Sequence, residues 1–137
     1  MLIKEFISET HKKQMIVTLL KHYKVANVRV KEKTIKKDHA HFNVDTGTLE
    51  LSTRYKIIKR NQIKEFLITI IHEIRHAMDA KKYGWQKFKD KYEMEMNYQI
   101  GQGKDEYKDN KYEIEAEEFG QKNWQKWYKI FQKDKLF

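Results

Sequence analysis

Two histidines four residues apart, with a glutamate next to the first, are the side chains of this chain whose types and spacing best fit a chemical function. They lie in the segment His72-Glu73-Ile74-Arg75-His76, inside an apolar run. On a helix, residues four apart leave the same face about one turn apart, so both imidazoles can share one metal ion. Glu73 can then accept a proton from a water molecule held by that ion. The motif predicts a hydrolytic metal site.

The composition restricts which ligands such a site can use. The chain has no cysteine, so the metal must be held by histidines and carboxylates. Two imidazoles with one carboxylate suit zinc better than magnesium or calcium, and we expect about one Zn²⁺ per chain. A catalytic zinc takes three protein ligands and leaves a position for water, so His72 and His76 need a third partner.

The third ligand is expected near the start of the last predicted helix. Glu113, Ala116 and Gly120 share one helical face through their spacing. Because Ala116 and Gly120 have almost no side chain, this face can approach another helix closely and bring Glu113 to the metal. Glu115 is the leading substitute for Glu113 in this role.

Two further residues of that helix are candidates for supporting roles. Glu117 lies one turn after Glu113 and can hydrogen-bond the outer nitrogen of a histidine ligand, which fixes the tautomer of the ring. Tyr112 directly precedes Glu113, and its phenol can stabilise an oxyanion. Tyr107 and His39 are alternatives to Tyr112.

The two motifs together resemble those of the gluzincin metallopeptidases. In that family His-Glu-x-x-His is followed by a helix with Glu-x-x-Ala-(Asp/Asn/Glu)-x-Phe-(Ala/Gly), and residues 113–120 match this pattern. The nearest look-alikes are small cytosolic proteins of phages and mobile elements, of the ImmA/IrrE and SprT-like kinds. The similarity extends over residues 40–125 and is specific at 69–78 and 112–120. The chain differs from related sequences at Arg75, Lys111 and Glu117. None of these differences removes a residue that would bind the metal.

The resemblance implies a role for each matching residue. His72, His76 and Glu113 would be the zinc ligands, Glu73 the general base, and Glu117 the residue that orients a histidine. The implied activity is hydrolysis of peptide bonds in a protein substrate, such as a regulatory protein of a phage or mobile element. An extended substrate would pair with an edge strand near residues 47–53.

Periodicity along the chain predicts the elements that position these residues. Apolar residues at helical spacing predict helices over 3–23, 62–82, 86–99 and 111–132, and alternation predicts strands over 26–34, 39–44 and 48–53. Asn61 is the expected N-cap of the metal-binding helix, and Gly84 its end. Asp45-Thr46-Gly47 predicts a hairpin turn. We therefore expect an α+β fold of one domain over 1–137, a minimal zincin-like domain with three antiparallel strands packed against the His-Glu-x-x-His helix and the C-terminal helix.

Two other groups of residues allow more than one interpretation. His39 and His41 lie two apart on a predicted strand and are a possible second metal pair, but ordinary strand side chains are favoured. Several aromatic residues of the last helix resemble a base-stacking platform, although their spacing favours a core stripe. This set comprises Trp124, Trp127, Tyr128 and Phe131.

Charge and hydropathy bear on partners and location. The net charge is +9, and residues 1–70 carry 15 Lys and Arg against 7 Asp and Glu. A basic half can face nucleic acid, but a solvated lysine-rich surface is favoured. Since no segment resembles a signal peptide or a membrane span, we expect a cytoplasmic protein.

Two alternatives to the peptidase remain, a DNA-associated SprT-like protease and a non-catalytic zinc-binding interaction module. Nothing in the sequence indicates the oligomeric state.

Overall fold

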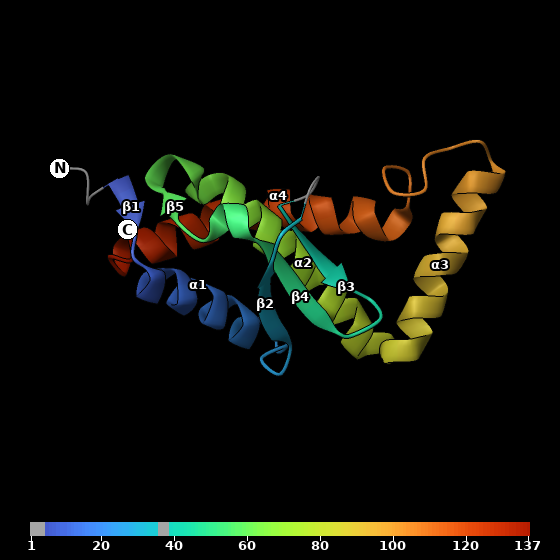
Figure 1. The fold of residues 1–137 in the computed structure, drawn as a ribbon, viewed down its shortest axis with the longest axis horizontal. Helices are drawn as coiled ribbons and strands as arrows, with labels where there is room; N and C mark the ends of the chain where they lie inside the picture. Colours follow the sequence, from blue (N-terminus) through green and yellow to red (C-terminus); the bar gives the residue numbers. More distant parts are fainter. Residues whose placement is uncertain (1–4, 36–38) are drawn as a thin grey trace.

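The chain folds into four helices and five short strands over residues 5–35 and 39–137, which a computed structural model describes (Figure 1). The helices are α1 (Glu9–His22), α2 (Ile63–Tyr83), α3 (Trp85–Gly101) and α4 (Lys111–Lys133). The strands are β1 (Phe6–Ile7), β2 (Arg29–Lys33), β3 (Ala40–Asn43), β4 (Thr48–Ser52) and β5 (Ile58–Lys59). Short 3-10 turns cover Thr53–Tyr55 and Arg60–Gln62. The α+β class is as expected.

The main sheet is mixed, so the prediction of three antiparallel strands was wrong. Its order is β2-β4-β3, with β3 and β4 antiparallel and β2 and β4 parallel. The hairpin turn, where Gly47 has φ of +73°, returns β4 into the space between β2 and β3. The chain reverses direction between β2 and β3 and again between β3 and β4, so β4 runs in the same direction as β2.

This strand order also changes which strand is at the edge of the sheet. The segment expected to pair with a substrate, 47–53, is mostly β4, which has a partner on both sides. That expectation was wrong, because β3 occupies the edge next to α2. The backbone oxygens of His39 and Asn43 accept hydrogen bonds from residues on the β4 side. In an antiparallel pair the alternate residues, Ala40 and Phe42, therefore direct their N–H and C=O groups toward the free edge.

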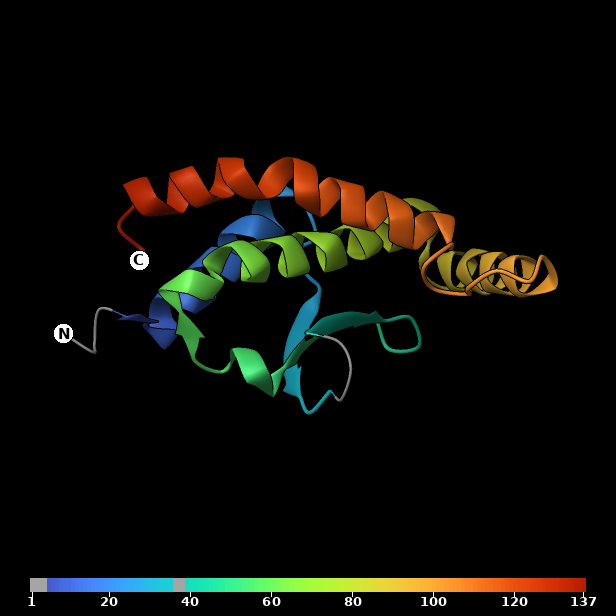
Figure 2. The ribbon, with the colours of Figure 1, turned by 90° about the horizontal axis from the view of Figure 1, so that it is seen from above.

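Helix α2 lies between the sheet and α4, and this layering places it at the centre of the molecule (Figure 2). One face of α2 packs on β3 and β4, and another on α4. Trp127 and Phe131 of α4 are buried, with Trp124 and Tyr128 packed against the same core. The aromatic residues of α4 thus form a core stripe, as their spacing favoured. Within the described ranges, no helix combines the length and apolarity needed to cross a membrane.

The observed helix boundaries differ from the predicted ones mainly at N-termini. Helix α1 begins at Glu9, where the Ser8 side chain accepts a hydrogen bond from a backbone N–H of the first turn. Of the residues predicted to precede it in this helix, 6–7 instead pair with β5, and 3–4 lie outside the described residues. The N-cap position of α2 is Gln62 rather than Asn61, because a 3-10 turn over Arg60–Gln62 directly precedes the helix. Gly84, at φ of +88°, ends α2 as expected.

Candidate metal centre

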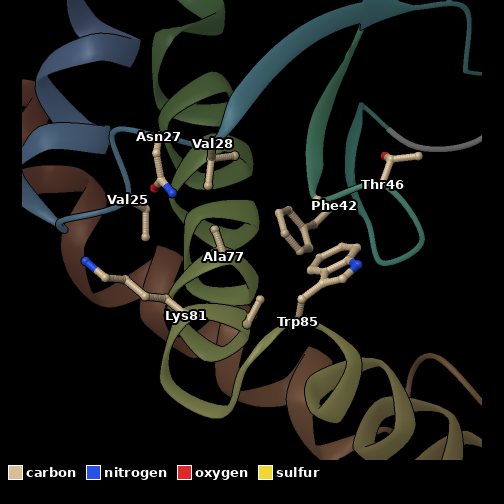
Figure 3. Close-up of a pocket in the computed structure, with 10 residues that line it drawn as sticks. Val25, Asn27, Val28, Phe42, Thr46, Ala77, Lys81 and Trp85 are labelled. Carbon is tan, nitrogen blue, oxygen red and sulfur yellow. The ribbon is translucent and has the colours of Figure 1, made fainter.

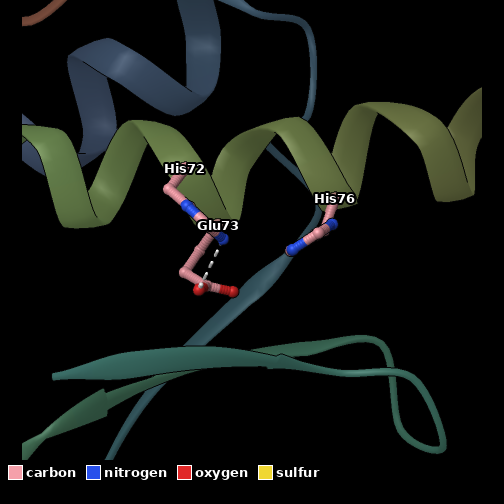
Figure 4. A group of neighbouring side chains, drawn as sticks. All are labelled: His72, Glu73 and His76. Carbon is pink, nitrogen blue, oxygen red and sulfur yellow. Dashed lines mark ion pairs between the residues drawn. The ribbon is translucent and has the colours of Figure 1, made fainter. Parts of the chain in front are cut away.

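Three adjacent polar side chains of α2 point toward the hairpin of β3 and β4 (Figure 4). All three side chains are buried: His72, Glu73 and His76 are 8%, 4% and 4% exposed. Each offers one ligand atom, and these atoms lie within 4.8 Å of one another. The helical spacing of 72 and 76 places both rings on one face, with ring centroids 5.1 Å apart. This cluster can hold a metal ion.

Glu113 of α4 completes the cluster from a second helix. Its Oε1 lies 2.9 Å from Nε2 of His72 and 2.8 Å from Nε2 of His76. The residue is in the first turn of α4, which begins where the Asn110 side chain accepts from a backbone N–H. A carboxylate is favoured there because the helix dipole is positive at the N-terminus. Two imidazole nitrogens and one carboxylate oxygen therefore converge on one point, and this donor set fits a divalent cation such as zinc.

Glu113 and the two histidines hydrogen-bond one another, and these contacts shift the pKa values of Glu113 and His72. Burial opposes ionisation of Glu113, but hydrogen bonds from His72 and His76 outweigh it and lower the pKa of Glu113. Burial also acts to lower the pKa of His72, but the hydrogen bond to Glu113 and the charge of Glu73 outweigh it and raise this pKa to about 9. A proton on Nε2 of His72 would lie where a cation would bind, so metal binding would release it.

Glu117 fixes the orientation of one of these rings. Its Oε2 accepts a hydrogen bond from Nδ1 of His72 at 3.0 Å, as the helical phase of 113 and 117 predicts. The hydrogen bond to Glu117 keeps a proton on Nδ1 of His72. In the neutral ring Nε2 therefore carries a lone pair, which faces His76 and Glu113 and is available to a metal ion.

Glu73, the remaining member of the cluster on α2, is almost fully buried. Its Oε1 is 3.8 Å from Nε2 of His72, and its Oε2 is buried without a hydrogen-bond partner among the described residues. Burial raises the pKa of Glu73 to about 7, although the charges of His76 and His72 and a backbone hydrogen bond from Phe42 act to lower it. The backbone of Phe42 and the neighbouring ring of His72 thus hold Glu73 at the cluster.

The two helices that carry the cluster approach closely because Gly120 has no side chain. A Cβ placed on Gly120 would lie 2.8 Å from the backbone oxygen of Ile68 and 3.6 Å from the backbone nitrogen of His72. Ala116, one turn earlier on α4, is fully buried. The small residues therefore let Glu113 reach both histidines, as the sequence predicted.

We expect Gly120→Ala to destabilise the chain by about 1–3 kcal/mol, since the added methyl group forces two backbones apart. Urea unfolding monitored by circular dichroism measures this difference. Gly101→Ala is the matched control, because a Cβ there meets nothing within 4 Å and the residue also lies in a helix. Equal stability losses in the two variants would contradict the close packing at Gly120.

Tyr92, which the sequence analysis did not single out, donates a hydrogen bond to Glu113. The hydroxyl of Tyr92, on α3, hydrogen-bonds Oε2 of Glu113. Burial, followed by the charge of Glu113, raises the pKa of Tyr92 well above its usual value, so the phenol remains a donor. Phe88 and Tyr92 are four apart on a helix that directly follows α2, and this spacing was the one available signal. Tyr112, the candidate for stabilising an oxyanion, packs against Phe88 and the ring of Tyr92.

Three of the other candidate residues, Glu115, His39 and His41, have partners outside the cluster. Glu115 is exposed and 3.8 Å from the guanidinium of Arg75, which also pairs with Asp79 at 3.5 Å, so the charge inside the His-Glu-x-x-His motif points away from the metal centre. His39 lies 2.8 Å from Glu65. His41 pairs with a different carboxylate, that of Glu50, so the two histidines do not form a shared site among the described residues.

A separate cavity of about 320 Å³ lies beside the cluster (Figure 3). Phe42 and Trp85 form one wall, opposite Val25 and Val28, with Ala77 of α2 between them. No residue of the His72, His76 and Glu113 cluster lines this cavity. The candidate centre is therefore distinct from this cavity.

Comparisons of the chain with protein-family models, with curated proteins and with solved structures find no match in any of the three.

Proposed function

We propose that this chain is a zinc-dependent peptidase of the gluzincin type, which hydrolyses peptide bonds in a protein substrate. The observation that carries the proposal is the position of Glu113. This residue lies 41 positions from His72 in sequence, yet its Oε1 meets the Nε2 atoms of His72 and His76. A His-Glu-x-x-His segment present by chance has no reason to meet a buried carboxylate from another helix.

His72, His76 and Glu113 would hold the zinc ion. When bound there, zinc supplies Lewis acidity toward a water molecule and toward the carbonyl oxygen of the peptide. The chain's contribution is to set the ligand geometry and to keep the surroundings apolar. The burial of all three ligands supports this role, since each is less than a tenth exposed.

Glu73 would move the proton. Its Oε2 is free of hydrogen bonds among the described residues, so it can accept a proton from the attacking water and then deliver it to the leaving amine nitrogen. Glu117 would keep the ring of His72 in place during these steps through the contact at Nδ1. Neither role requires a residue outside α2 and α4.

The substrate would bind in extended form along β3. Ala40 and Phe42 direct backbone groups to the edge of β3 that no strand of this sheet occupies, and such an edge can pair with an added strand. Phe42 is also the residue whose backbone contacts Glu73, so a peptide paired there would pass next to the proposed base. Backbone pairing accepts many sequences, which suits a protein substrate.

The proposal is tested by mass spectrometry of a peptide library and of denatured casein after incubation with the zinc-loaded chain. We expect cleavage that stops when 1,10-phenanthroline removes the metal and returns when zinc is added back. Cleavage that persists in the fully metal-free chain would contradict the proposal, as would a zinc-loaded chain that cleaves neither substrate.

A further inference from the structure

Helix α3 is tied at its start to the hairpin that forms the edge of the sheet. The ring of Trp85 packs edge-on against Phe42, with centroids 5.7 Å apart, and lies under the turn at Gly47. One turn later Nζ of Lys89 lies 2.8 Å from Asp45 of the same turn. These contacts hold the first half of α3 in a defined position relative to the site.

Tyr92 follows on this anchored part of α3, and its ring is held on three sides. Phe88 and His76 contact it edge-on with centroids 6.1 Å away, and the ring of Tyr112 stacks on it at 6.3 Å. The aromatic neighbours restrict rotation of the ring, so the hydroxyl is presented to Glu113 in one orientation. A donor that is already ordered loses little entropy when it forms its hydrogen bond.

The two oxygens of Glu113 consequently have different partners. Oε1 faces the nitrogens of His72 and His76, whereas Oε2 accepts from the hydroxyl of Tyr92. A carboxylate with one oxygen engaged by a fixed donor cannot rotate freely about its terminal bond. It therefore presents a single oxygen to the point where the three ligands converge.

We propose that Tyr92 is a positioning residue that holds Glu113 so that Oε1 alone serves as the metal ligand. This role rests on the proposed zinc site. It assigns to α3 a part in metal binding although α3 supplies no ligand. Loss of a hydrogen bond to a ligand typically weakens metal affinity by about 10- to 100-fold, and this is the effect we expect from Tyr92→Phe.

Tyr92→Phe keeps the aromatic packing and removes only the hydroxyl. Tyr112→Phe is the matched control, because Tyr112 stacks on Tyr92 but, among the described residues, its hydroxyl makes no hydrogen bond to His72, His76 or Glu113. Competition with a chromophoric chelator measures zinc affinity in both variants and in the native chain. We expect weaker affinity only in Tyr92→Phe, together with an altered visible absorption spectrum of its cobalt-substituted form.

A double variant separates positioning from other effects. If Tyr92 acts through Glu113, Tyr92→Phe should not weaken zinc binding further in a chain that already carries Glu113→Gln. An additive loss, or native affinity in Tyr92→Phe, would overturn the role of Tyr92 and leave the zinc site intact. Absence of zinc binding by the native chain would overturn both this role and the proposed function.

Discussion

Replacing both His72 and His76 with alanine is expected to reduce the zinc content of the purified chain from about one ion per molecule to none. The two Nε2 atoms face the same oxygen of Glu113, so their loss leaves only the carboxylates of Glu113 and Glu73 at the cluster. Without an imidazole ligand, we expect these carboxylates to hold zinc too weakly to retain it through purification. Elemental analysis by inductively coupled plasma mass spectrometry, with the protein concentration determined independently, measures the ratio.

The chain contains a matched control for this experiment. His39 and His41 also form a closely spaced pair, but each contacts a different glutamate, Glu65 or Glu50. His39→Ala/His41→Ala should therefore keep the native zinc content. Stoichiometric zinc in the variant that lacks His72 and His76 would show that the metal binds elsewhere.

Replacing Glu73 with glutamine is expected to preserve zinc binding and to reduce peptidase activity by about 10²–10⁴-fold, the usual contribution of a general base. Glutamine has nearly the same shape as glutamate but cannot accept and return the proton. The fold should tolerate the change, because it removes a carboxyl group whose pKa is raised to about 7 mainly by burial. Rates of cleavage and zinc content are measured on the same preparations.

Glu118→Gln is the control for this second variant. Glu118 is exposed on α4 and lines a surface hollow with Arg75 and Phe119, away from the metal centre. We expect it to retain native zinc content and activity. If Glu73→Gln loses zinc as completely as the variant without His72 and His76, Glu73 is a ligand or a structural group, and its role as a base is wrong.

The helical part of the site could be predicted because helix periodicity is local. The spacing of 72 and 76 defines one face of α2, and that of 113, 116 and 120 defines one face of α4. The small side chains at 116 and 120 further indicated that the faces could meet, and a Cβ at Gly120 would indeed collide with α2. From these facts the position of Glu113 follows without knowledge of the rest of the fold.

The sheet could not be predicted in the same way, since strand order depends on contacts between distant segments. The alternation in 26–34, 39–44 and 48–53 identifies strands but contains no information on which of them are neighbours. Consecutive strands often pair, yet β4 lies between β2 and β3. The strand proposed to pair with a substrate changed with this order, from β4 to β3.

Tyr92 was missed for a related reason. Its neighbours in sequence are charged or aromatic residues typical of any amphipathic helix, and its partner Glu113 lies 21 positions later. The direction of α3 is set by the sharp turn at Gly84 and by the contacts of Trp85 and Lys89 with the hairpin. Tyr112 was favoured because it adjoins Glu113 in sequence, but adjacent residues on a helix leave it in different directions.

The crystal structure of the zinc-loaded chain, with zinc located by anomalous scattering at its absorption edge, tests the central claim most directly. We expect one zinc ion bound by Nε2 of His72, Nε2 of His76 and Oε1 of Glu113, at about 2.0–2.2 Å from each. Tyr92 should remain hydrogen-bonded to the other oxygen of Glu113. Zinc found at other residues, or held by the histidines with Glu113 turned to solvent, would contradict the account.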